Sequence, residues 1–134
     1  MKLLLDTHVL LWALCNDPQL SLRARNMIED ETNEIYYSIV SPWEVEIKRL
    51  AHPDRMALSS EQLSKYCSAS GFYCLPVRES HINQLKHLHR EEQAPEHKDP
   101  FDRIMICQAM AEKMLFLTHD RQLILYREAC IIEV

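Results

Sequence analysis

Acidic residues recur where short apolar runs of the sequence give way to helical patterns. Asp6 ends the first apolar run, Glu44 lies in the first turn of a helical pattern, and Asp120 follows a later apolar run. Asp99 and Asp102 open the helical pattern that precedes that later run. If the apolar runs are parallel strands, these junctions lie on one edge of the sheet and the carboxylates converge. Converging carboxylates stay ionised together only around a cation, and their oxygen ligands favour Mg²⁺ or Mn²⁺.

The helix-start signals around these acids leave a purely structural alternative open. Ser41 is a good N-cap and Pro42 a good first helical residue, so Glu44 could be a capping-box partner. Asp99 could likewise cap its helix, with Asp102 stabilised by the helix dipole. Each segment alone favours capping. The recurrence of acids at successive junctions is what favours a shared site.

Other polar residues at these junctions also allow two roles. Asp6 has little structural purpose between an apolar run and a helix, whereas Asp120 could be a turn or cap residue. Thr7 and Thr118 could position waters or ligand carboxylates, although such hydroxyls more often cap the backbone. We expect Arg103 to pair with a neighbouring acid rather than with a substrate phosphate.

The elements that must position the acids follow from the alternation of apolar runs with helical patterns, which is typical of a parallel sheet covered by helices. The patterns predict strands at residues 2–5, 35–40, 72–77, 114–118 and 130–134. They predict helices at residues 7–14, 21–31, 41 to near 52, 59 to 71, 79–89 and 99–113. Pro76 cannot donate to a ladder, which favours an edge position for the third strand. With no repeat and no linker, we expect residues 1–134 to form a single domain.

The composition of the chain restricts the kinds of site that it can build. The 134 residues carry a formal charge of −5, which argues against holding nucleic acid mainly through a basic surface. A bound metal ion could supply the missing positive charge. The single glycine, Gly71, excludes the glycine-rich phosphate-binding loops of nucleotide-binding folds.

Cysteine usage and the absence of long apolar runs favour a cytoplasmic protein. The five cysteines are widely spaced and mostly set in apolar runs, as expected of reduced thiols that fill a core. No apolar run approaches the roughly 20 residues that a membrane-spanning helix needs, so no membrane partner is expected. Asp6 interrupts the apolar start of the chain and no cleavage site follows, which favours a strand over a signal peptide.

Histidine and tryptophan residues suggest further kinds of site, and both have simpler interpretations. The seven histidines include His87, His89 and His97, but their spacing fits no standard helical zinc pair. A charged surface stretch from Lys86 to Lys98 explains them. The two tryptophans lie in apolar helical patterns and are expected to anchor a core or an interface rather than to stack on bases.

Four segments of the chain resemble the motifs of one family. They are Leu3-Leu-Leu-Asp-Thr-His-Val-Leu-Leu-Trp12, Ser41-Pro-Trp-Glu-Val-Glu-Ile-Lys48, His97-Lys-Asp-Pro-Phe-Asp-Arg-Ile-Met-Ile-Cys-Gln-Ala109 and Leu117-Thr-His-Asp120. In this order, and over almost the whole chain, they resemble the PIN-domain superfamily and, more narrowly, the VapC-like toxin ribonucleases. Two local departures, Pro42 and His119, remove no carboxylate.

The resemblance implies a three-layer α/β/α sandwich with a central parallel sheet, Mg²⁺ or Mn²⁺ as cofactor, and endonucleolytic cleavage of RNA. It also implies a homodimer and a cognate antitoxin. Carried onto this chain, the metal-binding and catalytic acids would be Asp6, Glu44 and Asp102, with Asp120 as the fourth. Asp99 would be an added metal-binding acid on the same helix face as Asp102, and which of these two takes the inner position is open.

The chemistry implied by the resemblance needs no protein nucleophile. One or two metal ions would bind a phosphodiester oxygen, lower the pKa of a water and stabilise the charge that develops at the leaving oxygen. An antitoxin could block this site with a basic side chain that reaches Asp6, Glu44 and Asp102. An amphipathic helix of the antitoxin could lie beside the helical patterns at residues 10–14 and 43–50.

Other classes of protein explain the acids less well. A phosphatase of the haloacid-dehalogenase type needs a second acid two residues after the first strand's Asp, where this chain has His8. A receiver-type domain needs an acceptor Asp at the end of a middle strand, whereas Glu44 lies in a helix start. The most serious alternative is a PIN-like protein that has lost catalysis and serves as a binding partner or scaffold.

Overall fold

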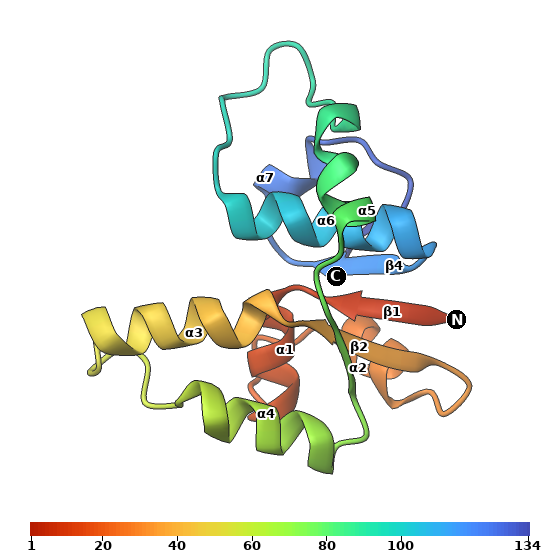
Figure 1. Ribbon diagram of the computed structural model, residues 1–134. Coiled ribbons are helices and arrows are strands. Elements are labelled where there is room, and N and C mark those ends of the chain that lie inside the picture. The colour runs from red at the N-terminus through yellow and green to blue at the C-terminus, as the bar shows by residue number, and fades with distance from the viewer.

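Strands and helices alternate along the whole chain. The computed structural model describes residues 1–134 (Figure 1). The strands are β1 (Lys2–Leu5), β2 (Glu34–Ser38), β3 (Tyr73–Leu75), β4 (Leu115–Thr118) and β5 (Ile131–Glu133). The helices are α1 (Thr7–Leu14), α2 (Leu22–Glu29), α3 (Val40–Ala51), α4 (Ser60–Ala69), α5 (Glu79–Asn83), α6 (Pro100–Glu112) and α7 (Arg121–Ile124), with a 3₁₀ turn η1 (Leu85–His87).

All five strands are parallel and lie in the order β3-β2-β1-β4-β5. The central strand is β1, where the chain turns from one half of the sheet to the other, and its Leu5 pairs with Tyr37 of β2 and Leu117 of β4. Ligands of open parallel sheets bind at this kind of switch point, beyond the carboxyl ends of the strands. The edge position predicted for the third strand is confirmed.

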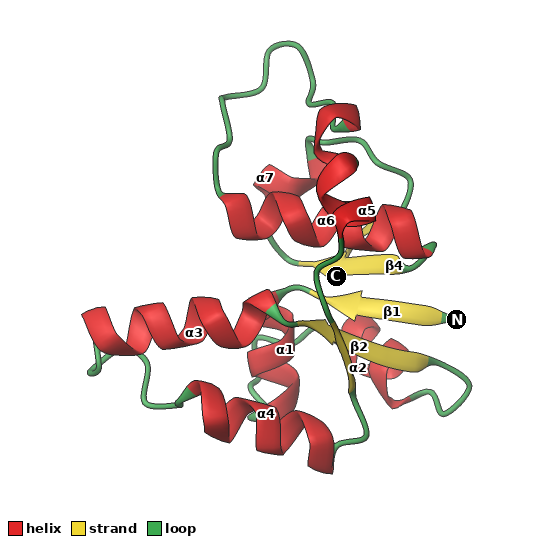
Figure 2. Cartoon of the chain, in the orientation of Figure 1, coloured by secondary structure: helices red, strands yellow, loops and turns green.

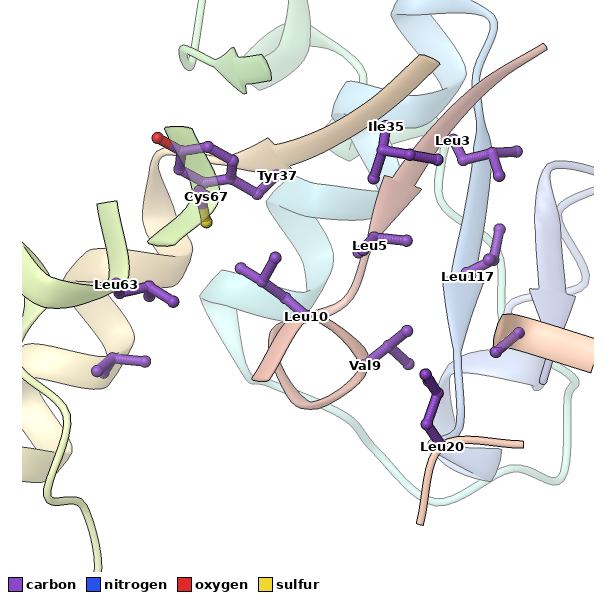
Figure 3. Close-up of a cluster of buried hydrophobic side chains, with 12 residues drawn as sticks. Leu3, Leu5, Val9, Leu10, Leu20, Ile35, Tyr37, Leu63, Cys67 and Leu117 are labelled. Carbon is purple, nitrogen blue, oxygen red and sulfur yellow. The ribbon is translucent and has the colours of Figure 1, made fainter. Parts of the chain in front are cut away.

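Side chains that alternate along β1 fill two separate cores on opposite faces of the sheet. Leu3 and Leu5 belong to a cluster that contains residues of α1 and α4 (Figure 3). Leu4 belongs to a second cluster that contains residues of α6 and Tyr126. Figure 2 shows helices on both sides of the strands. The predicted three-layer α/β/α sandwich with a central parallel sheet is confirmed.

Local signals in the sequence account for several helix ends. Ser59 and Gln62 form a capping box at the start of α4, and Gly71 follows the helix with a φ of 77°. Asp99 caps α6 and Pro100 takes its first helical position. These boundaries agree with the predicted ones to within about two residues.

Two helices depart from their predicted boundaries. The helix expected at residues 79–89 is divided, because Gln84 and His87 donate to carbonyls three residues earlier and tighten the chain into 3₁₀ geometry. His81 is fully buried at this point and contacts Glu112 of α6 through a 2.8 Å hydrogen bond. The short helix α7 was not predicted at all, because four residues carry too little periodicity.

The expectation that most cysteines fill the core is wrong. Only Cys67 and Cys107 are buried, whereas Cys15 and Cys74 are exposed and Cys130 is intermediate. All five are free thiols. The helices are all too short or too polar to cross a membrane.

Candidate active site

Asp6 follows β1 directly and is almost completely buried, with 6% of its surface exposed. Its Oδ1 atom accepts a 2.8 Å hydrogen bond from the amide of Thr7, and its Oδ2 atom accepts a 2.6 Å hydrogen bond from the hydroxyl of Thr118. Burial raises the pKa of Asp6, and these two hydrogen bonds partly oppose that effect. Thr118 therefore orients a carboxylate, in addition to accepting from the amide of Asp120.

Glu44 does not take part in a capping box, so the structural alternative for this acid is wrong. The helix begins at Val40, and the buried hydroxyl of Ser41 lies 2.8 Å from the hydroxyl of Thr7 instead of capping the helix. Glu44 Oε2 lies 3.6 Å from Lys48 Nζ. Glu44 Oε1 is buried and has no hydrogen-bond partner. A buried acceptor without a partner is unusual in proteins and indicates a missing donor or cation.

Asp99 and Asp102 play different parts at the start of α6. Asp99 caps the helix by accepting hydrogen bonds from the amides of Phe101 and Asp102, at 2.9 and 3.2 Å. The side chain of Asp102 is only 13% exposed, and its Oδ2 atom lies 3.2 Å from Nε2 of His97. Burial, followed by the nearby charges of the other acids, raises the pKa of Asp102 to about 8.

Asp120 lies at the exposed end of the arrangement. It follows β4 and caps α7 by accepting a 2.9 Å hydrogen bond from the amide of Gln122. The predicted capping role is therefore present for Asp120, as it is for Asp99. In both residues the cap engages one carboxylate oxygen and leaves the other without a hydrogen-bond donor from the protein.

All five predicted acids line one pocket of about 330 Å³ at the carboxyl end of the sheet. The pocket is lined by Asp6, His8, Trp12, Glu44, Lys48, Asp99, Asp102, His119 and Asp120. Lys48 is the only lysine or arginine among these residues, so carboxylates dominate the charge of the pocket. The structure thus brings together residues that lie up to 114 positions apart in the sequence.

The donor set of this pocket fits a hard divalent cation. As the side chains stand, no group of three or more His, Cys, Asp or Glu residues is arranged to hold a metal ion together. The pocket nevertheless combines oxygen donors from five carboxylates, the unpartnered oxygen of Glu44, and an Asp102 whose ionisation is opposed by burial and by the charges of its neighbours. A cation would relieve both the repulsion and the unpartnered oxygen.

Several residues around the pocket were assigned other roles from the sequence. His97 was expected in a charged surface stretch, yet its side chain is 13% exposed and contacts Asp102. A signal for this contact was present in the sequence. His97 precedes Asp102 by five residues and so lies next to the start of α6. The expected acidic partner of Arg103 is absent: its guanidinium donates a 3.4 Å hydrogen bond to the carbonyl of His97.

The two tryptophans occupy different positions. Trp12 is partly buried, packs against the first core and lines the acidic pocket between His8 and His119, whose rings it meets edge-on. Trp43 is 60% exposed and meets the ring of Phe101 edge-on at 4.9 Å. Trp43 therefore belongs to the surface rather than to a core.

Comparisons with known proteins give a family model and a structural relative. The model of the PIN domain matches residues 3–129. The crystal structure of VapBC2 from Rickettsia felis bound to a DNA fragment from its promoter is similar to this chain with a TM-score of 0.67. The two chains are 17% identical, and the match covers 100% of this chain and 98% of the other. A comparison with curated protein sequences gives no significant match.

Proposed function

The chain belongs to the PIN domain family, and on this premise we propose that it is a divalent-metal-dependent endoribonuclease, the toxin of a VapBC-type toxin–antitoxin pair. The observation that carries this proposal is the convergence of five carboxylates on one pocket that has a single lysine. The raised pKa of Asp102 and the unpartnered oxygen of Glu44 support a cation among them. The fold shared with the VapBC2 structure supports the toxin assignment.

In this proposal Asp6, Glu44 and Asp102 hold Mg²⁺ or Mn²⁺, with Asp120 and Asp99 at the outer side of the site. When bound, such a cation offsets the charge of a phosphodiester and lowers the pKa of a water nucleophile. Thr118 fixes the Asp6 carboxylate through its 2.6 Å hydrogen bond. The exposed side chains of His8 and His119 lie at the pocket and are available to contact the RNA backbone.

The acidity of the pocket also supports a basic antitoxin segment as its inhibitor. An arginine or lysine side chain inserted among the carboxylates would take the place of the cation. A small reading frame beside this gene would mark the pair. Its product should bind the wild-type chain and lose affinity when Asp6, Glu44 and Asp102 are changed to amides. Binding that survives these changes and does not compete with Mn²⁺ would count against the assignment.

An apolar surface on the side of α3 and α5 supports a homodimer. It surrounds a hollow of about 650 Å³ lined by Ile39, Val40, Trp43, Val77, Ile82, Leu85, Pro100, Phe101 and Ile104, with no charged residue among them. A second copy offers the same apolar patch, as an isologous interface requires, without charge repulsion. Ile82→Lys should therefore give a monomer in light scattering, whereas Leu22→Lys on the exposed face of α2 should leave the dimer intact. If Ile82→Lys and Leu22→Lys have the same molecular mass in light scattering, the dimer does not form through this apolar surface.

The cytoplasm is the compartment in which RNA and an antitoxin would meet this protein. The five free thiols, of which Cys15 and Cys74 are exposed, support a reducing environment. Cell fractionation that finds the protein only outside the cytoplasmic fraction would contradict this proposal.

The test of the proposed activity is cleavage of RNA by the purified chain, freed of any bound inhibitor. We expect cleavage of single-stranded or structured RNA in Mg²⁺ or Mn²⁺ and its loss in chelator. Cleavage that chelator does not diminish would exclude the metal-dependent mechanism. A chain that binds RNA or protein partners but cleaves nothing with either metal would favour a non-catalytic PIN-like protein.

A further inference from the structure

Two side chains outside the acidic pocket form a hydrogen-bonded chain that ends on Asp102. His97 lies between η1 and α6, and its Nε2 atom lies 3.2 Å from Asp102 Oδ2. The other ring nitrogen of His97 lies 2.6 Å from the hydroxyl of Tyr126. Tyr126 is 2% exposed and His97 13% exposed, so water has little access to these bonds.

The chemistry of the three groups fixes the direction of the hydrogen bonds when Asp102 is ionised. A carboxylate only accepts, so Nε2–H of His97 must donate to it. The Nδ1 atom of a neutral imidazole is then an acceptor, and the hydroxyl of Tyr126 must donate to it. The Asp102 carboxylate therefore sets the histidine tautomer, and the Tyr126 hydroxyl supplies the matching donor to Nδ1, which holds the ring in place.

The hydrogen-bonded chain from Asp102 through His97 to Tyr126 ends in the second core. The ring of Tyr126 belongs to the second core, together with Leu123 of α7. The guanidinium of Arg90 lies 4.8 Å from the centre of this ring. Arg90 also donates hydrogen bonds to the carbonyls of Pro95 and Gln122, at 3.1 and 2.7 Å, and so ties the segment before α6 to α7.

We infer that His97 and Tyr126 are positioning residues that hold the Asp102 carboxylate in the orientation needed to bind a cation. The inference rests on the proposed metal site and adds to it two residues that do not line the acidic pocket. Carboxylates that bind metal ions are commonly held by such outer hydrogen bonds, and the loss of one typically lowers metal affinity about 10–100-fold. Without the Tyr126 hydroxyl, Nδ1 of His97 has no partner and the imidazole loses the 2.6 Å hydrogen bond that keeps its Nε2–H directed at Asp102.

The test is the affinity of the purified chain for Mn²⁺, measured by calorimetry at one fixed pH without RNA. Tyr126→Phe keeps the ring in the core and removes only the hydroxyl, and we expect it to weaken Mn²⁺ binding by about 10-fold. His97→Ala should weaken binding at least as much. His97→Gln keeps an N–H donor at the same reach, so it should restore most of the affinity. RNA cleavage by Tyr126→Phe should fail at limiting Mn²⁺ and recover at high Mn²⁺.

Two matched variants control for side effects of the substitutions. Tyr66→Phe removes the hydroxyl of a half-exposed tyrosine on α4, and His89→Ala removes an exposed histidine from the same segment as His97. Both should bind Mn²⁺ like the wild type. If the wild type itself fails to bind Mn²⁺, the proposed metal site fails. If the wild type binds and Tyr126→Phe binds equally well, the metal site stands and the positioning role is overturned, even if His97→Ala does not fold.

Discussion

The hydroxyl of Thr118 donates a 2.6 Å hydrogen bond to Oδ2 of Asp6 and joins the ends of two adjacent strands at the acidic pocket. Thr118 is fully buried, and valine has nearly the same shape. Thr118→Val removes the donor to Asp6, so we expect RNA cleavage to fall by about 10-fold or more and the free energy of unfolding to fall by about 1 kcal/mol. Single-turnover kinetics and urea unfolding measure the two effects.

The control is Thr32→Val, which removes a hydroxyl from a surface turn and should retain full cleavage. Unchanged cleavage by Thr118→Val would show that the hydrogen bond has no positioning role.

The raised pKa of Asp102 predicts how the metal-free protein responds to pH. Because the folded state holds the proton of Asp102 up to about pH 8, while the unfolded state releases it near pH 4, the folded state binds more protons between these values. Stability in chelator should therefore decrease as pH rises from about 4 to about 8. Asp102→Asn removes the share of this dependence that comes from Asp102, and at pH 8 it should raise the free energy of unfolding by at least about 1 kcal/mol. Urea unfolding in chelator at several pH values measures both. A variant with the same pH dependence as the wild type would rule out Asp102 as its source.

The two glutamates near the start of α3 provide a matched pair. Glu44 faces the pocket with an unpartnered oxygen, whereas Glu46 pairs with Arg49 and accepts from the amide of Ser60. Glu44→Gln should abolish Mn²⁺ binding and preserve the fold, because it removes one of the like charges. Glu46→Gln should leave Mn²⁺ affinity unchanged. If calorimetry shows that Glu46→Gln loses Mn²⁺ binding and Glu44→Gln retains it, the metal site lies elsewhere.

The substitutions Asp99→Asn and Asp99→Ala separate the helix-capping role of Asp99 from its role in binding the metal ion. Asparagine caps a helix about as well as aspartate, whereas alanine costs about 1 kcal/mol. We expect Asp99→Asn to keep the unfolding free energy and to lower Mn²⁺ affinity only slightly, since one oxygen of Asp99 already serves the cap. Asp99→Ala should unfold more easily. A loss of Mn²⁺ affinity in Asp99→Asn as large as in Asp102→Asn would make Asp99 the inner ligand.

Much of the fold follows from local patterns in the sequence. The short apolar run before Asp6 predicts a buried strand, and in the structure its side chains fill both faces of the sheet. Caps such as Ser59 and Asp99 mark helix starts, and acids that follow β1 and β4 or lie near the starts of α3 and α6 are enough to predict the convergence. The prediction depended on parallel pairing, which the pattern of short apolar runs already indicated.

The features that the sequence did not predict depend on contacts between distant residues. Ser41 looks like an N-cap, but its hydroxyl contacts Thr7 and the helix begins before it. His97 looks like part of a solvated stretch, but Tyr126, 29 residues away, supplies its partner. Such pairings leave no periodic signal, because each involves one residue and a neighbour from another element.

The measurement that tests the account most directly is single-turnover RNA cleavage at saturating Mn²⁺ by the wild type, Asp6→Asn and Asp102→Asn, with thermal unfolding of the same samples in chelator. The account predicts that both substitutions abolish cleavage while the metal-free folds are at least as stable as the wild type, because each removes one of several crowded like charges. Cleavage at the wild-type rate by either variant, or marked unfolding of both, would contradict a metal-binding carboxylate site.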